Sequence, residues 1–127
     1  FGLRRVGHAG LIAFLTVAAG HLLLASAGDE TLTSFIVLQA LSLMSFAFCS
    51  ANFSTLAMTN MGSIAGTASS VQGVVSTIVG ATIGLIIGQA FNGTVLPFLA
   101  GAALCAAAAL GLVLATERGR LMEPLAA

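Results

Sequence analysis

The sequence predicts an all-α, polytopic membrane protein with four transmembrane helices, and three observations carry this prediction. Hydrophobic residues make up 58% of the 127 residues and charged residues 6%, whereas soluble domains carry about a quarter of their residues as charges. The mean hydropathy is +1.10. No Asp, Glu, Lys or Arg occurs between Thr31 and Thr116, and a bilayer core requires about 20 mostly apolar residues for each helical crossing.

Each span is a continuous apolar run without period-two alternation, which favours helices over the strands of a membrane barrel. The first run contains His8 and His21 and ends at the solvated turn Gly28–Glu30. The second closes in the polar stretch "SANFSTLAMTN", and "FNGTVLP" forms a tight turn before the fourth. We therefore expect the spans at about 6–27, 34–51, 62–90 and 96–116.

The arginines predict the orientation of these spans. They lie near the two chain ends, at Arg4, Arg5, Arg118 and Arg120. An even number of spans places both ends on one side, and the positive-inside rule makes that side cytoplasmic. Asp29 and Glu30 are then expected on the outer side.

The N-terminus allows two interpretations. The chain opens at Phe1 without an initiator methionine, so we expect it to be a segment of a longer protein. Alternatively, "LRR", the apolar run and "ASA" before Gly28 could form a signal peptide. The apolar run is about 20 residues long, however, whereas a signal core has about 7 to 15, and this mismatch favours a membrane span.

Small residues line one side of the third span. In a helix, the glycines that we call the glycine ridge step by about one or two turns along that side: Gly62, Gly66, Gly73, Gly80, Gly84 and Gly88. Small residues at this spacing let membrane helices approach closely, so the ridge is predicted to pack against another helix. A smooth ridge is also suited to two bundles that rock during transport. Because "GSIAGTAS" lacks the lysine of a phosphate loop, phosphate binding is not expected.

The second span carries a polar stripe at helical spacing, and it supplies the candidates for a substrate cavity: Gln39, Ser42, Ser45 and Cys49. Asn52 continues the same side. Polar groups at membrane depth face protein or a water-filled cavity, because lipid cannot satisfy them. Hydrogen bonding between helices and the lining of a cavity both remain open.

Other function classes find little support. The net charge is zero and lysine is absent, so no nucleic-acid partner is expected. We predict no enzyme activity, catalytic residue, metal site or cofactor. Cys49 and Cys105 are expected at different membrane depths, which disfavours a disulfide and favours packing roles. The first and fourth spans look peripheral, and His21 is interpreted as an interfacial histidine with ordinary solvation rather than a proton-handling group.

One long block resembles a known family. "LAMTNMGSIAGTASSVQGVVSTIVGATIGLIIGQAFNGTVLPFLAG" resembles the penultimate helix and last turn of drug-resistance transporters of the Bcr/CflA type, in the major facilitator superfamily. The block 65–70 and the glycines that follow it carry most of the match. "FGLRR" is similar to the end of the basic cytoplasmic loop before the ninth helix.

The resemblance implies that the four spans are helices nine to twelve of a twelve-helix carrier, whose N-terminal helices precede this segment. In such carriers the tenth helix borders the central cavity, the eleventh packs against the opposite half, and the ninth and twelfth face lipid. Proton-driven efflux of small drug-like molecules across the bacterial inner membrane is the implied activity. This chain departs from the family at Thr59 and Asn60, where relatives often have an acidic residue and a proline.

No acid lies inside the predicted spans, so a carboxylate for proton coupling is expected in the N-terminal part. The alternative function is a small, self-contained four-helix membrane protein that oligomerises through its glycine-rich helix. In both cases lipid is the expected surroundings of the chain.

Overall fold

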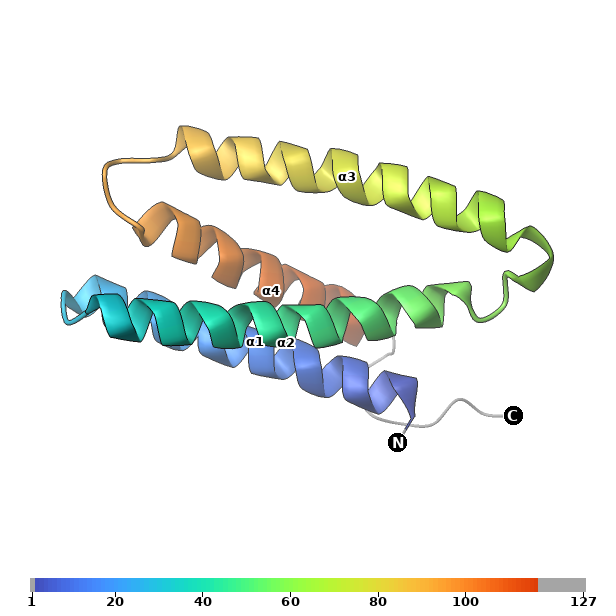
Figure 1. Ribbon diagram of the computed structural model, residues 1–127, viewed down its shortest axis with the longest axis horizontal. Helices are drawn as coiled ribbons and strands as arrows, with labels where there is room; N and C mark the ends of the chain where they lie inside the picture. Colours follow the sequence, from blue (N-terminus) through green and yellow to red (C-terminus); the bar gives the residue numbers. More distant parts are fainter. Residues whose placement is uncertain (1, 117–127) are drawn as a thin grey trace.

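The computed structural model describes residues 2–116, and the regular secondary structure in that range consists of helices joined by short turns. Its elements are α1 (Leu3–Ala27), α2 (Leu32–Met58), the short 3-10 helix η1 (Gly62–Ile64), α3 (Ala65–Gln89) and α4 (Leu96–Thr116) (Figure 1). Four of the described segments are long and apolar enough to cross a membrane, as the sequence predicts. The chain is therefore a membrane-embedded protein. Arg118 and Arg120, on which part of the orientation rests, lie outside the described residues.

The turns on one side of the bundle form where the sequence predicts them, because glycine supplies the backbone that they need. Gly28 has φ 80° and caps α1, with its N–H donating to the Ala25 carbonyl. Gly93 has φ 86°, and beside it the Asn92 side chain accepts hydrogen bonds from the N–H and hydroxyl of Thr94. Both glycines occupy the left-handed region that other residues rarely adopt. Both turns lie at the left in Figure 1.

The second span is longer than expected, because the polar stretch after Cys49 is helical. Three side chains in this stretch donate back to carbonyls four residues earlier: Asn52 to Phe48 at 2.7 Å, Thr55 to Ala51 at 2.9 Å and Thr59 to Thr55 at 3.2 Å. Such local bonds satisfy polar groups without leaving the helix. The helix consequently runs to Met58 instead of closing near residue 51.

The start of the third span also differs from the prediction. Residues Gly62–Ile64 form one 3-10 turn, and the α-helix begins at Ala65. A 3-10 helix has three residues per turn, whereas an α-helix has 3.6. Gly62 therefore precedes the regular helix that carries the other ridge glycines, Gly66 to Gly88.

Helix α1 lies at the centre of the described packing. It runs alongside α2 and also contacts α4, and its buried residues are Gly7, His8, Leu11, Ala18 and His21. The prediction that the first span is peripheral is therefore wrong for the packing within residues 2–116. These residues share one side of the helix because they recur at three-, four- and seven-residue steps.

Close approach of α1 and α2 depends on glycine. A Cβ atom built on Gly10 would lie 3.1 Å from the backbone nitrogen of Cys49 and 3.3 Å from its Cα. One turn earlier, a Cβ atom on Gly7 would lie 3.5 Å from the Asn52 Cβ. Two helices separated by so little backbone clearance gain dense van der Waals contact, which is the main attraction between helices in lipid.

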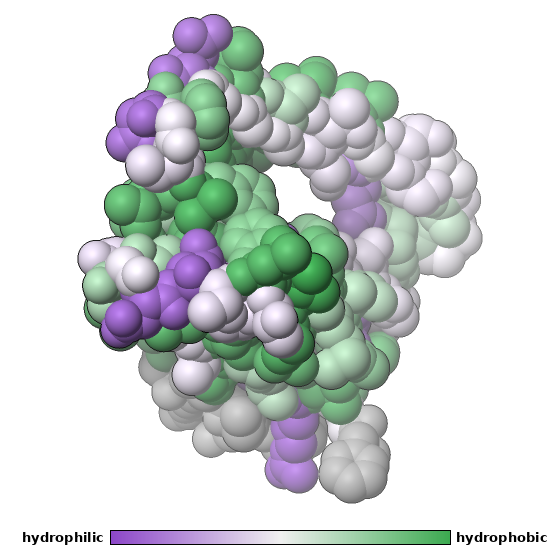
Figure 2. All heavy atoms as spheres, turned by 60° about the vertical axis from the view of Figure 1, so that its left-hand side comes forward, coloured by the Kyte–Doolittle hydropathy of each residue, from purple (hydrophilic) through white to green (hydrophobic). Residues whose placement is uncertain are grey.

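Helix α3 stands apart from the other three. It makes few contacts with α2 and α4, and none of its residues is buried. Figure 2 shows the resulting opening between the uppermost helix and the rest of the molecule. At one end Ile87 does press on α4, where a Cβ atom on Gly101 would lie 2.7 Å from the Ile87 Cγ1.

Candidate functional site

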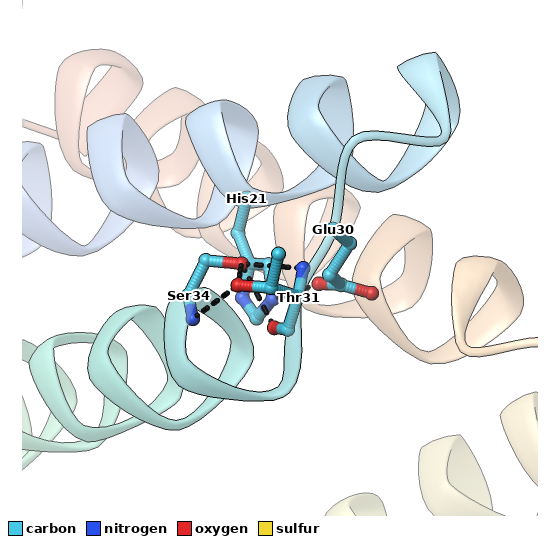
Figure 3. Close-up of polar contacts among 4 residues, drawn as sticks. All are labelled: His21, Glu30, Thr31 and Ser34. Atoms are coloured by element: carbon cyan, nitrogen blue, oxygen red, sulfur yellow. Dashed lines mark hydrogen bonds and ion pairs between the residues drawn. The ribbon is translucent and has the colours of Figure 1, made fainter.

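A cap at the start of α2 fixes the geometry of the site at the α1–α2 turn. The hydroxyl of Thr31 accepts from the Ser34 N–H at 3.2 Å, and the Thr31 N–H donates to the Ser34 hydroxyl at 2.8 Å. This reciprocal pair is a capping box, which satisfies backbone donors that the first turn of a helix leaves open. It starts the helix at Leu32, and Glu30, the residue before the N-cap Thr31, turns toward α1 (Figure 3).

His21 and Glu30 form a close pair beneath this cap. The His21 Nε2 and the Glu30 Oε1 are 2.7 Å apart. The His21 side chain is 1% exposed and the Glu30 side chain 17%. The ring of Phe35 from α2 meets the imidazole edge-on at a centroid distance of 5.3 Å. The carboxylate of Glu30, the imidazole of His21 and the phenyl ring of Phe35 thus close the end of the α1–α2 interface that lies next to the turn.

The pair corrects one expectation from the sequence. His21 is not an interfacial histidine with ordinary solvation, because the whole residue is buried. A carboxylate also reaches into the described helices, although no acid lies within a predicted span, because Glu30 extends from the turn to a histidine inside α1. The sequence separates the two residues by nine positions, and the folded turn between the helices brings them together.

A small cavity lies next to His21, between α1, α2 and α4. It has a volume of about 120 Å³. Its walls combine three phenylalanines with three polar residues and small or aliphatic side chains: Phe14, Phe46, Phe98, His21, Gln39, Ser42, Ala18, Leu43, Leu99 and Ala102. Two of the four predicted cavity residues, Gln39 and Ser42, are therefore brought together with a histidine that the prediction left out.

The other two residues of the polar stripe lie further along α2. Ser45 lines a separate hollow of about 300 Å³ between α1 and α2, which Gly10 and Met44 also line. Cys49 is buried and packs on Gly10. Both cysteines are free, Cys49 buried and Cys105 exposed. The stripe thus faces α1 and divides between the cavity near the α1–α2 turn and helix packing further along α2.

A third hollow, which the sequence prediction missed, separates α2 from α3. It has a volume of about 460 Å³ and is rich in hydroxyl groups, contributed by Ser50, Ser54, Ser69 and Ser76. The Gln72 Nε2 donates to the Ser54 hydroxyl across it at 3.1 Å. The sequence does contain this signal, as serines four residues apart in α2 and seven residues apart in α3. The glycines of α3, however, favoured an interpretation in terms of helix packing.

The glycine ridge has no packing partner within the described chain. A Cβ atom on Gly62, Gly66, Gly73, Gly80, Gly84 or Gly88 would meet nothing within 4 Å. The predicted packing role of these six residues therefore depends on a surface other than residues 2–116, and it stays a prediction.

The described residues contain no metal-binding cluster, since nowhere in 2–116 do three His, Cys, Asp or Glu side chains gather closely enough to hold an ion. Comparisons of the chain with protein-family models, curated proteins and solved structures found no match. The assignment of function consequently rests on the residues and their arrangement.

Replacement of Glu30 by alanine should destabilise the α1–α2 hairpin. His21 Nε2 would keep its burial and lose its partner, and an unsatisfied buried polar group costs about 1–3 kcal/mol. The measurement is the free energy of unfolding in mixed detergent micelles, followed by circular dichroism. Asp29→Ala is the matched control, because Asp29 is the exposed neighbour on the same turn. Equal stability of the two variants would show that the pair contributes nothing to the fold.

Proposed function

We propose that the chain forms the C-terminal part of a proton-coupled multidrug efflux transporter of the major facilitator superfamily, which works by alternating access. Its substrates would be small drug-like molecules, exchanged for protons across a bacterial inner membrane. Both chain ends would be cytoplasmic. The resemblance of the block 65–70 and its following glycines to Bcr/CflA-type carriers provides the starting point.

The observation that carries the proposal is the isolation of α3. This helix is long and apolar enough to cross a membrane, yet its glycine ridge meets no atom within 4 Å. In lipid, a small-residue face gains its van der Waals energy by close contact with another helix. The N-terminal half of a twelve-helix carrier would supply that contact, and its motion against the ridge would alternate access to a central site.

The charged residues at the two ends of α1 support the proposed orientation. Arg4 and Arg5 lie in its first turn, and Asp29 and Glu30 follow its last. At about 1.5 Å per residue, a helix of 25 residues separates the two groups by more than the thickness of a hydrocarbon core. The basic end is the cytoplasmic one under the positive-inside rule.

Two experiments test the proposal. The reading frame upstream of Phe1 should continue for about 270 codons rich in apolar runs, which is the room that eight further spans and their loops require. Cysteines introduced at the two ends of the chain should be protected from a membrane-impermeant labelling reagent in intact cells. A stop codon with a nearby start, or ends on opposite faces, would refute the carrier.

A second candidate is a small, self-contained four-helix protein that oligomerises through α3. The same exposed ridge favours it, because small residues at this spacing let two membrane helices pack closely, so the α3 helix of a second copy could pack on the ridge. A single cysteine at position 80, in a background lacking Cys49 and Cys105, distinguishes the candidates. Efficient disulfide dimerisation in membranes supports the oligomer, whereas the carrier buries this position against its own N-terminal half.

A further inference from the structure

We propose that a groove between α1 and α2 binds one anionic phospholipid, from the leaflet at the basic end of α1. Its acyl chain would lie in the groove, and its phosphate would accept hydrogen bonds from the Arg5 guanidinium. The groove is the hollow that Ser45 lines, and its other walls include Val6, Ala9 and Ala13 from α1 with Met44 and Phe48 from α2. The inference concerns lipid binding alone, so it holds for both functions considered above.

The walls of the groove suit a hydrocarbon chain that enters from the surrounding lipid. Ser45 is the one polar residue among them. On the α2 wall the side chains of Met44 and Phe48 are 55% and 56% exposed, and on the α1 wall Ala9 and Ala13 are exposed as well. An acyl chain can therefore reach the groove from the side, and it gains dispersion contacts along both walls.

The depth of the groove matches one leaflet of a bilayer. Helix α1 begins at Leu3, so Ala13 lies about 15 Å along its axis at about 1.5 Å per residue. Half of a hydrocarbon core of about 30 Å is also about 15 Å. The groove thus runs from the basic end of α1 to about the middle of the membrane, which is the depth that an acyl chain of that leaflet occupies.

The end of the groove at the membrane surface is polar. A Cβ atom on Gly7 of α1 would lie 3.5 Å from the Asn52 Cβ of α2, and the two helices run in opposite directions (Figure 1). Arg5 is therefore level with the turn of α2 between Asn52 and Thr55. These two polar residues follow Phe48 at steps of four and three, so they continue the side of α2 that lines the groove.

The charge of Arg5 selects an anionic headgroup. Its side chain is exposed and lies one turn before Ala9, so its stem can follow the groove while the guanidinium reaches the membrane surface. A guanidinium is always charged, and its fork of N–H donors matches the oxygens of a phosphate. Among residues 2–116 the two acids, Asp29 and Glu30, lie at the opposite end of α1. Basic pockets between membrane helices generally recognise anionic headgroups, whereas phosphatidylcholine brings a second positive charge.

The experiment compares two lipids that differ in headgroup charge. The 127-residue chain in detergent micelles is titrated with phosphatidylglycerol or with phosphatidylcholine of the same acyl chains, and native mass spectrometry gives the dissociation constant of the first bound lipid. We expect phosphatidylglycerol to bind about fivefold more tightly, as one arginine near an anionic headgroup allows. Equal affinities would overturn the proposal.

Two matched variants separate a site from diffuse attraction to positive charge. Arg5→Gln should remove the preference for phosphatidylglycerol. Arg4→Gln removes the same charge one turn before the buried His8, on the packed side of α1, and should keep most of the preference. Equal losses in the two variants would mean diffuse attraction and would overturn the site. Ala13→Phe, which fills the groove, should weaken binding of both lipids, and unchanged binding would refute the position of the acyl chain.

A measurement on the unaltered chain does not depend on whether a variant folds. With 13C-labelled methionine methyl groups, the resonance of Met44 reports on the groove. Phosphatidylglycerol that carries a nitroxide in the middle of an acyl chain should broaden this resonance more strongly than the same amount of nitroxide-labelled phosphatidylcholine. Equal broadening by the two lipids would refute the proposed site.

Discussion

Replacing Gly10 by leucine is expected to force α1 and α2 apart and to cause a large loss of stability. The new Cβ atom would lie 3.1 Å from the Cys49 nitrogen and 3.3 Å from its Cα. Both are backbone atoms, which cannot rotate away as the end of a side chain can. Overpacking of a dense interface costs about 1–3 kcal/mol, and three further carbons beyond Cβ place this variant at the upper end of that range.

Gly20→Leu provides the matched control for this result. Gly20 lies in the same helix, and a Cβ atom there would meet nothing within 4 Å. Its replacement adds an apolar side chain to an exposed, lipid-compatible position and removes a residue that costs a helix about 1 kcal/mol relative to alanine. Unfolding in mixed micelles should therefore show a large loss for Gly10→Leu and none for Gly20→Leu. Comparable losses at both positions would contradict the close helix contact.

The local features of this fold could be predicted from the sequence. The last three spans follow from the absence of charge between Thr31 and Thr116, because a helix in lipid must be apolar along its length. The turns at Gly28 and Gly93 follow from the backbone freedom of glycine. The predicted limits of the fourth span, 96–116, coincide with α4, since Thr94 and Leu96 start the helix directly after a glycine turn.

Features that depend on tertiary contact could not be predicted in the same way. The burial of His21 depends on the turn that brings Glu30 back to it, and no spacing rule for one helix contains that information. Gly7, Gly10 and Ala18 did carry a small-residue signal in α1. The more numerous glycines of α3 gave the same signal more strongly. Only the packed structure shows that the small residues of α1, and not those of α3, make close helix contacts within this chain.

The candidate site could be predicted only in part, because some of its residues come from helices that meet only in the folded chain. A polar stripe identifies which side of α2 faces protein, so Gln39 and Ser42 were found from their spacing. Periodicity does not identify the helix that faces them, however. Phe14, His21 and Phe98 come from two other helices, and their contribution appears only when α1, α2 and α4 are packed.

Under the proposed carrier function, replacing Gly84 or Gly80 by leucine is expected to abolish or strongly reduce drug export by the full-length protein. The described residues leave both positions open, with nothing within 4 Å, so a leucine there should leave the helices of this chain in place. The loss would arise where the ridge meets a helix outside residues 2–116. Close small-residue contacts between membrane helices have no room for a leucine, and the two halves of a carrier would neither seat nor rock correctly.

Thr82→Leu is the matched control, because position 82 lies on the opposite side of α3 from Gly80 and Gly84 at about 100° per residue. Export of a panel of fluorescent drug-like dyes from cells is the readout, with immunoblotting to confirm equal amounts of each variant in the membrane. Thr82→Leu should export dye like the unaltered protein. Export by Gly84→Leu at the same rate would show that the ridge does not pack against a moving partner, because a contact so close cannot absorb a leucine without consequence.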